Sequence, residues 1–201
     1  MLERSDGKPA YSRNRLAFTE WQPLASGARS MLDFAMSTLA AYTDAEEAAE
    51  RVRREFWGDS VPVDPAQVAE ALGVEVLAAQ LGPQLAGALV KEPGRDPRIF
   101  LNGADNPNRK RFTCAHEIGH FVKRADADND YEYYDFRDSF SSSSGVDPEE
   151  RYANAFAAAL LMPKDRIKQM KKEGLKDIEM AARFGVSREA MIYRLKALEL
   201  A

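Results

Sequence analysis

Apolar and polar positions recur with several different periods along this chain, and the period changes at residues that commonly begin or end helices. Thr43 followed by Glu46 has the spacing of a capping box, which predicts a helix running to about Trp57. Asp64-Pro65 combines a capping side chain with a proline at the first helical position. It therefore predicts a second helix, which we expect to end at Gly73.

Three short apolar segments follow, and they predict a small β-sheet. The segments are Val74–Leu77, Gly87–Lys91 and Arg98–Asn102. The last two flank Glu92–Pro97, which is rich in turn-forming residues, and this arrangement is typical of a hairpin. We interpret the strand at residues 98–102 as an exposed edge, to which a peptide could add as a further strand.

The middle of the chain predicts two helices separated by a long loop. Asn106-Pro107 begins a helix that runs to about Lys123. The segment Arg124–Gly145 has no clear period and is interpreted as a loop, of a length that is usually functional. Asp147-Pro148 then begins a helix that we expect to end before Pro163.

The C-terminal segment has a helix, turn, helix pattern. Lys176–Phe184 and Ser187–Leu198 are separated by Gly185-Val186, and the spacing resembles a helix-turn-helix. These patterns together predict an α+β fold in which the sheet packs beside the helix of residues 107–123 and the helix of residues 148–162 crosses it. We divide the chain into an N-terminal extension (residues 1–44), a core (45–163) and a helical C-terminal subdomain (164–201).

Composition places the chain among soluble globular proteins. It has 201 residues, of which 45% are hydrophobic and 30% charged. No apolar run approaches the roughly 20 residues of a membrane span, and the polar start lacks the pattern of a signal peptide. The single cysteine, Cys114, excludes an internal disulfide and fits the cytoplasm. We expect Cys114 to lie in the core.

The net charge of −4 is unevenly distributed. Residues 164–201 contain ten Lys or Arg against six Asp or Glu, which leaves −8 on the rest of the chain. Residues 125–150 contain nine acidic residues and one arginine. The basic end could contact nucleic acid, whereas the acidic segment favours a basic protein partner.

One motif carries catalytic chemistry. His116-Glu117-x-x-His120 lies within the helix predicted for residues 107–123, and these are the only two histidines of the chain. Residues four apart lie about 40° apart around a helix, so both imidazoles can bind one zinc ion at about 2.0–2.1 Å. Glu117 beside them can take a proton from water as it attacks a carbonyl. The alternative is a solvated pair of histidines on an ordinary helix.

A catalytic zinc ion needs a third protein ligand, and this chain leaves a carboxylate as the expected type. Glu150 is the best candidate, although the spacing Asp147-x-x-Glu150 also fits a helix cap. Glu149 is the second candidate. Further acids lie in the predicted loop, where they would be held less firmly; they are Asp126, Asp128, Asp130 and Asp135. Two histidines and one carboxylate can hold zinc or manganese. A purely structural zinc site would be expected to use more cysteines than this chain has.

Two stretches together resemble the ImmA/IrrE family of metallopeptidases. They are Phe112-Thr-x-Ala-His-Glu-Ile-Gly-His120 and Glu150-Arg-Tyr-Ala-Asn-Ala-Phe-Ala-Ala-Ala-Leu-Leu-Met-Pro163. The resemblance extends over about residues 45–200, and residues 1–44 have no counterpart. It implies a zincin-like, gluzincin-like core in which His116, His120 and Glu150 bind zinc and Glu117 is the catalytic carboxylate.

Other polar residues have expected supporting roles. Asn154 lies one turn after Glu150, where its side-chain oxygen could accept the free ring N–H of a zinc-bound histidine; an ordinary helical asparagine is the alternative. The oxyanion needs a further electrophile, which Tyr131, Tyr133 or Tyr134 in the predicted loop could supply. An arginine is also an option, and each tyrosine could equally be a plain loop aromatic.

The resemblance implies a function as a zinc-dependent endopeptidase that cleaves a helix-turn-helix transcriptional repressor. Cleavage would relieve repression in a stress response or of a mobile element. Such repressors are basic on their DNA-binding face, which agrees with the acidic segment next to the motif.

The alternative is a DNA-binding regulator with a non-catalytic metal site. Ser187 would cap its second helix, and four side chains would face nucleic acid: Arg188, Tyr193, Arg194 and Lys196. We do not favour DNA binding, because the apolar residues of this segment suffice to explain a small packed subdomain.

Overall fold

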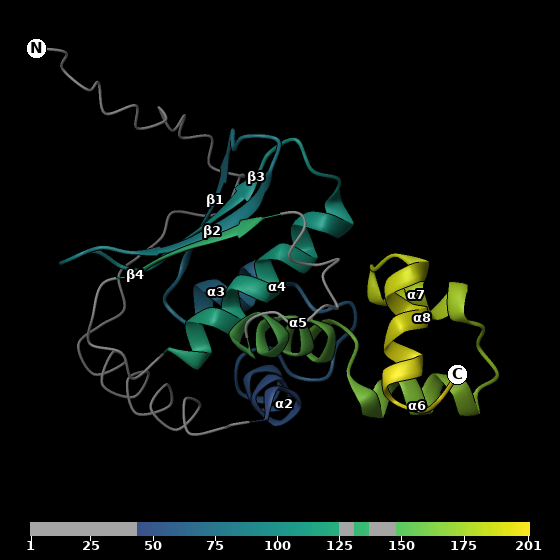
Figure 1. Cartoon of the computed structure of the whole chain (residues 1–201). Helices are drawn as coiled ribbons and strands as arrows, with labels where there is room; N and C mark the ends of the chain where they lie inside the picture. Colours follow the sequence, from purple (N-terminus) through teal and green to yellow (C-terminus); the bar gives the residue numbers. More distant parts are fainter. Residues whose placement is uncertain (1–43, 125–130, 137–147) are drawn as a thin grey trace, which may run out of the picture.

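The computed structural model describes residues 44–124, 131–136 and 148–201, with residues 131–136 described as backbone only. This part of the chain forms an α+β fold of seven helices and one four-stranded sheet (Figure 1). The elements are α2 (Ala45–Phe56), α3 (Pro65–Ala71), β1 (Glu75–Ala79), β2 (Leu85–Lys91), β3 (Arg98–Asn102), α4 (Pro107–Lys123), β4 (Tyr131–Phe136), α5 (Pro148–Leu161), α6 (Lys164–Lys172), α7 (Asp177–Phe184) and α8 (Arg188–Ala197).

The helices begin where capping side chains satisfy their first backbone N–H groups. Asn106 accepts a hydrogen bond from the backbone N–H of residue 109 at 2.9 Å, and Asp64 and Ser187 cap α3 and α8 in the same way. The predicted cap of α2 was wrong. Asp44 caps this helix and accepts from the backbone N–H of Glu46 at 2.7 Å, while Thr43 lies outside the described residues.

The strands form one mixed sheet in the order β1-β3-β2-β4. β1 pairs parallel with β3, and β2 pairs antiparallel with both β3 and β4. The predicted hairpin of β2 and β3 is therefore confirmed, but β3 is not an exposed edge. Residues 99–102 of β3 are all buried, as expected for a central strand with neighbours on both sides.

The segment interpreted as a continuous loop contains β4, which was not predicted. Its backbone pairs with β2 in a register that joins Tyr133 to Leu89 and Tyr134 to Ala88. An edge strand forms through hydrogen bonds to a neighbour that is distant in the sequence, so its local pattern is a weak guide. Within the described strands, β4 and β1 form the two edges of the sheet.

The hydrophobic core lies between the sheet and the helices. α4 packs against β2 and β3, and α5 packs against α4 and α2 (Figure 1). The predicted arrangement of the sheet, α4 and the crossing α5 is thus confirmed. Ala79, Ala88 and Phe100 form a separate, smaller apolar cluster.

The three C-terminal helices pack onto the rest of the protein through a continuous apolar core. Met180, Phe184 and Met191 are buried in the same cluster as the core of α2, α4 and α5. Gly185 takes a left-handed conformation at the turn between α7 and α8, with φ of 64°. The domain boundary at residue 163 and the helix-turn-helix resemblance stay predictions.

Among the described residues, no helix combines the length and the apolar character that crossing a membrane requires.

Candidate metal centre

Helix α4 directs a row of polar side chains towards α5. His116, His120 and Arg124 are spaced by four residues, so they share one face of the helix. Both histidine side chains are buried, at 0% and 1% exposure. A Cβ atom at Gly119 would lie 3.0 Å from the Cα atom of Ala153 on α5, so a glycine there allows the two helices to approach closely.

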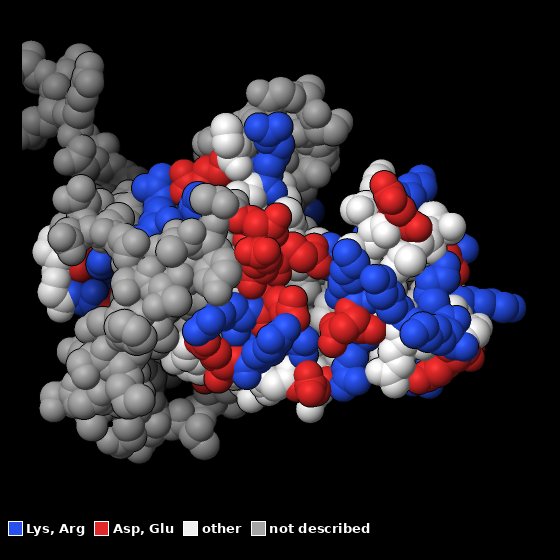
Figure 2. Space-filling view, turned by 90° about the horizontal axis from the view of Figure 1, so that it is seen from below, with Lys and Arg blue, Asp and Glu red and all other residues white. Residues whose placement is uncertain are grey.

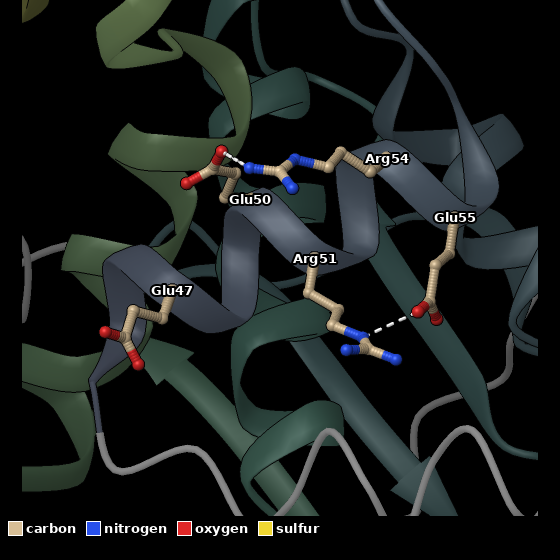
Figure 3. Close-up of a pocket in the computed structure, with 5 residues that line it drawn as sticks. All are labelled: Glu47, Glu50, Arg51, Arg54 and Glu55. Carbon is tan, nitrogen blue, oxygen red and sulfur yellow. Dashed lines mark hydrogen bonds and ion pairs between the residues drawn. The ribbon is translucent and has the colours of Figure 1, made fainter.

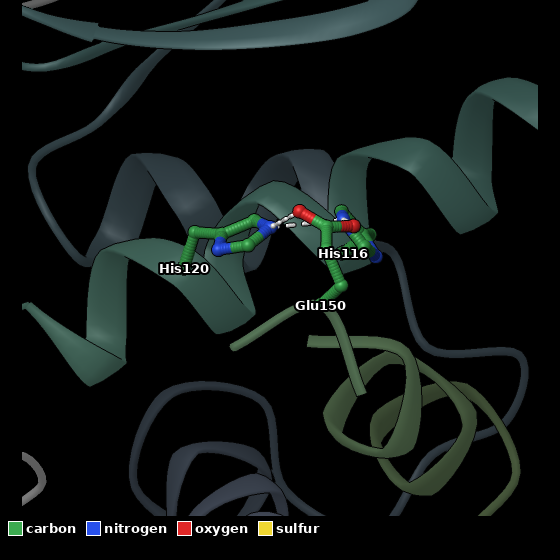
Figure 4. Close-up of side chains that lie close together, drawn as sticks. All are labelled: His116, His120 and Glu150. Atoms are coloured by element: carbon green, nitrogen blue, oxygen red, sulfur yellow. Dashed lines mark hydrogen bonds and ion pairs between the residues drawn. The ribbon is translucent and has the colours of Figure 1, made fainter. Parts of the chain in front are cut away.

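Helix α5 brings Glu150 to the two histidines (Figure 4). Its Oε2 lies 3.4 Å from His116 Nε2, and its Oε1 lies 3.2 Å from His120 Nε2. The two Nε2 atoms are themselves 3.0 Å apart. The three side chains thus converge from two separate helices on one small volume.

These separations fit a tetrahedral metal site. Ligand atoms at about 2.0–2.1 Å from a zinc ion lie about 3.3 Å from one another when the geometry is tetrahedral. The two Nε2 atoms lie 3.0 Å apart, and each lies 3.2–3.4 Å from a different oxygen of the Glu150 carboxylate, so each of these separations is close to that value. The donor types agree as well, because two imidazole nitrogens and a carboxylate are common zinc ligands. This set of three protein donors is therefore able to hold one divalent ion.

The charge of Glu150 is stabilised by the two histidines. Burial of the carboxyl group raises its pKa, but the nearby rings of His116 and His120 together outweigh burial and hold the pKa far below its ordinary value. Glu150 is consequently an anion at neutral pH, which is the form that a metal ligand requires.

Asn154 contacts the other side of the His116 ring. Its Oδ1 lies 3.0 Å from His116 Nδ1. With the amide oxygen as the acceptor, Nδ1 carries a proton, and a deprotonated Nε2 can then bind a metal ion. The contact that the sequence suggested for Asn154 is therefore present.

Glu117 lies on the side of α4 that faces the sheet. Its side chain is fully buried. A Cβ atom at Gly87 of β2 would lie 3.1 Å from Glu117 Oε1 and 2.4 Å from Thr113 Cγ2. Any larger residue at position 87 would therefore push against the carboxylate, and the sequence alone did not single out this glycine.

Glu149, the second candidate ligand, has different partners. Its carboxylate accepts two hydrogen bonds from Arg124, at 2.6 Å from Nε and 2.9 Å from Nη2. Its Oε1 lies 3.8 Å from Nδ1 of His120, the ring nitrogen that does not face Glu150. Glu149 is not part of the cluster that His116, His120 and Glu150 form. In the sequence, the spacing of four residues between His120 and Arg124 was the one indication that both side chains could contact the same residue of α5.

The structure leaves several candidates untested. Tyr131, Tyr133 and Tyr134 belong to β4, whose backbone alone is described. Asp135 lies in the same strand, and the other acids of the predicted loop (Asp126, Asp128 and Asp130) lie outside the described residues.

Cys114 lies in the hydrophobic core, as predicted, and burial raises the pKa of its thiol.

The surface proposed for DNA binding differs from expectation at one residue. Arg194 was expected to face nucleic acid, but it is buried at 6% exposure. It donates to the backbone oxygen of Met162 at 3.1 Å and to both carboxylate oxygens of Glu46 on α2. The contacts of Arg194 with Glu46 and with Met162, both distant in the sequence, explain the difference.

Other basic side chains gather over the C-terminal helices, as Figure 2 shows at the right of the view. Arg188 pairs with Asp177 at 2.9 Å, and Tyr193 is 73% exposed. Ser187 does cap α8, and Lys196 is exposed.

A surface hollow on α2 is lined by glutamate and arginine side chains alone (Figure 3). All five side chains that line it come from that one helix. Arg51 pairs with Glu55 at 2.6 Å and Arg54 pairs with Glu50, each one turn apart. Such pairs are typical of a solvated helix face and contribute little to stability.

Residues 69–196 match the model of a peptidase family described as the IrrE N-terminal-like domain. Over 101 residues the chain is 36% identical to the radiation response metalloprotease IrrE of Deinococcus radiodurans, covering 48% of this chain and 30% of that protein. It is 34% identical to the protein of the same name from Deinococcus deserti, covering 48% of this chain and 35% of that protein. The match therefore spans about a third of the length of these relatives.

The fold is similar to that of a solved Mycobacterium tuberculosis transcriptional regulator, with a TM-score of 0.54 and 20% sequence identity. The alignment covers 84% of this chain and 51% of the regulator. At this identity, the similarity concerns the fold alone.

Proposed function

This chain belongs to the IrrE N-terminal-like family of peptidases, and from that premise we propose that it is a zinc-dependent endopeptidase. The observation that carries the proposal is the convergence of His116, His120 and Glu150, whose ligand atoms all lie within 4.8 Å of one another. Manganese is the alternative metal, because the same donors can hold it.

Each residue of the centre has a proposed role. His116, His120 and Glu150 hold the ion. When bound, the metal supplies Lewis acidity that activates water and polarises the scissile carbonyl. Glu117 accepts the proton of the attacking water and returns it to the leaving amine. Its burial between α4 and β2 limits the positions that the carboxylate can take. The stabiliser of the oxyanion is proposed to come from β4, where Tyr131, Tyr133 and Tyr134 lie.

The proposed substrate is a basic, DNA-binding repressor of the helix-turn-helix type, cleaved in the cytoplasm. The acidic composition of residues 125–150 supports a basic partner. An extended segment of the substrate could add to an edge of the sheet. β3 is a central strand and cannot accept a further strand. We propose β4 as the edge that binds the substrate, because β4 pairs with β2, and β2 carries Gly87 beside Glu117.

A DNA-binding regulator remains the second proposal, and the structure offers it less support than the sequence did. Arg194, one of the four residues expected to contact DNA, instead donates a hydrogen bond to Glu46. Salt-dependent DNA binding by the full chain, lost when Arg188 and Lys196 are replaced by glutamine, would favour it.

Replacing Glu117 by glutamine tests the proposed chemistry. Glu117→Gln keeps the shape of the side chain but removes the proton acceptor, so we expect bound zinc to be unchanged and peptidase activity to fall about 100- to 10,000-fold. Zinc content is measured on the purified chain, and cleavage is followed against a repressor encoded beside its gene.

Glu189→Gln, an exposed position on α8, is the matched control and should cleave as the wild type does. Full activity of Glu117→Gln would remove the proposed role of this residue.

A further inference from the structure

The two histidines of the candidate centre are both held from α5, but by different kinds of side chain. His116 Nδ1 faces the Asn154 amide oxygen at 3.0 Å, whereas His120 Nδ1 faces the Glu149 carboxylate at 3.8 Å. We propose that Glu149, held in place by Arg124, orients the His120 ring for metal binding and strengthens it as a ligand. This inference rests on the proposed metal centre.

The geometry separates Glu149 from the ligands themselves. It approaches Nδ1 of His120, and the opposite ring nitrogen, Nε2, faces Glu150 at 3.2 Å. A carboxylate on the Nδ1 side cannot reach an ion bound at Nε2. Neighbouring residues of a helix point about 100° apart, which explains how Glu149 and Glu150 reach opposite sides of one ring.

Arg124 fixes the position of the Glu149 carboxylate. The guanidinium donates to both carboxylate oxygens, at 2.6 and 2.9 Å, in the paired geometry that makes arginine–carboxylate contacts directional. Arg124 lies one turn after His120 at the end of α4. The ring and the arginine therefore hold Glu149 from adjacent turns of the same helix, and the carboxylate has little freedom to turn away.

The chemistry explains why a carboxylate is useful there. A histidine that binds metal through Nε2 carries its proton on Nδ1, and an anion beside that proton favours this tautomer and raises the basicity of Nε2. At 3.8 Å the contact is longer than a hydrogen bond, so its effect is electrostatic. The side chain of Glu149 is 21% exposed, and its charge is only partly screened.

A simpler explanation is that Glu149 only places negative charge in the first turn of α5, where the helix dipole favours it. Glu149→Asp separates the two explanations. Aspartate keeps the charge in the first turn, but its side chain is shorter by one methylene and withdraws from His120 and Arg124.

The test measures zinc affinity by competition with a chelator, and the state of each ring by long-range proton–nitrogen NMR of the zinc-loaded full chain. With two histidines in the sequence, the ring signals can be assigned to single residues. We expect Glu149→Ala to lower zinc affinity about 10- to 100-fold and to shift the ring nitrogens of His120 but not those of His116. Asn154→Ala should give the reverse pattern.

Further variants sharpen the result. We expect Glu149→Asp to weaken zinc binding as Glu149→Ala does, and Arg124→Gln to weaken it less. Glu189→Gln, an exposed acid in the first turn of α8, is the control and should match the wild type. Wild-type zinc affinity in Glu149→Asp would assign the residue to the helix dipole, and wild-type affinity with unshifted His120 signals in Glu149→Ala would overturn the proposal.

Glu150→Ala distinguishes failure of this inference from failure of the metal centre. If Glu150→Ala releases zinc but Glu149→Ala does not, the inference alone is wrong. If Glu150→Ala binds zinc as the wild type does, the proposed centre is wrong as well. Should Glu149→Ala fail to fold, as judged by circular dichroism, Glu149→Asp and Arg124→Gln carry the same test.

Discussion

A comparison of two clusters of polar side chains that join helices shows that they are built differently. At the junction of α8 with α2, Arg194 donates to Met162 O and to both carboxylate oxygens of Glu46. At the contact of α4 with α5, two histidine Nε2 atoms and a carboxylate face one another at 3.0–3.4 Å. The first cluster is an arrangement of donors with acceptors, whereas the second is an arrangement of potential metal ligands.

This difference teaches how a structural charge can be distinguished from a functional one. A buried charge that serves stability is expected to find its hydrogen-bond partners within the protein, as Arg194 does. Two imidazole nitrogens and a carboxylate that meet in a buried place form a set of donors that one cation can share. We therefore expect changes at the first cluster to alter the free energy of unfolding, and changes at the second to alter metal binding and peptidase activity.

The largest effect is expected where the sheet approaches the second cluster. Gly87→Ala would bring a methyl group to 3.1 Å from Glu117 Oε1 and 2.4 Å from Thr113 Cγ2. The contact with Thr113 requires β2 or α4, the helix that carries Glu117, to shift. Displacement of a catalytic group by about 1 Å can cost about 100-fold, so, with Glu117 in its proposed role, we expect kcat to fall by up to that factor while zinc content is unchanged. Steady-state kinetics and metal analysis measure both quantities.

A second substitution shows whether the steric account is correct. Thr113→Ser removes Cγ2, so the pair Gly87→Ala with Thr113→Ser should regain part of the kcat lost in Gly87→Ala. Gly82→Ala is the matched control, because a Cβ atom at Gly82 would have no neighbour within 4 Å. Unchanged kcat in Gly87→Ala would show that a side chain at position 87 does not disturb Glu117.

A smaller effect is expected at the first cluster. Arg194→Met keeps an apolar side chain of similar length but removes the hydrogen bonds to Glu46 and Met162 O. Hydrogen bonds to charged groups contribute about 1.5–3 kcal/mol, and Glu46 is partly exposed, so we expect the free energy of unfolding to fall by about 2 kcal/mol. Urea unfolding of the metal-free chain measures this change.

The same variant also tests the division between the two clusters. Arg194→Met should bind zinc and cleave substrate as the wild type does at temperatures where it is folded. Loss of zinc binding in folded Arg194→Met would show that the two clusters are coupled, and the comparison would then fail.

Features set by neighbouring residues were predictable from the sequence. The cap at Asn106 and Pro107 located the start of α4, and the spacing of His116, Glu117 and His120 indicated the metal chemistry. Asn154 was identified because it lies one turn from Glu150 on the same helix, and the contact with His116 is present. Helical spacing is a local property, and it does not depend on how the elements pack.

Features set by contacts between distant segments were not predictable. The central place of β3 depends on its pairing with β1, and β4 depends on its pairing with β2. Arg194 lies in a basic segment, and only its packing against α2 shows that it is buried. Gly87 is likewise one of 12 glycines in the sequence, and only the packing of the sheet against α4 shows that it lies beside Glu117. Each of these requires the tertiary arrangement.

X-ray absorption at the zinc edge, on the purified zinc-loaded chain, measures the ligands directly. We expect one zinc ion surrounded by nitrogen and oxygen atoms at about 2.0–2.1 Å, with the signature of two imidazole rings, and loss of that signature when both histidines are replaced by alanine. A sulfur atom at about 2.3 Å would implicate Cys114, and a spectrum without imidazole would contradict the proposed centre.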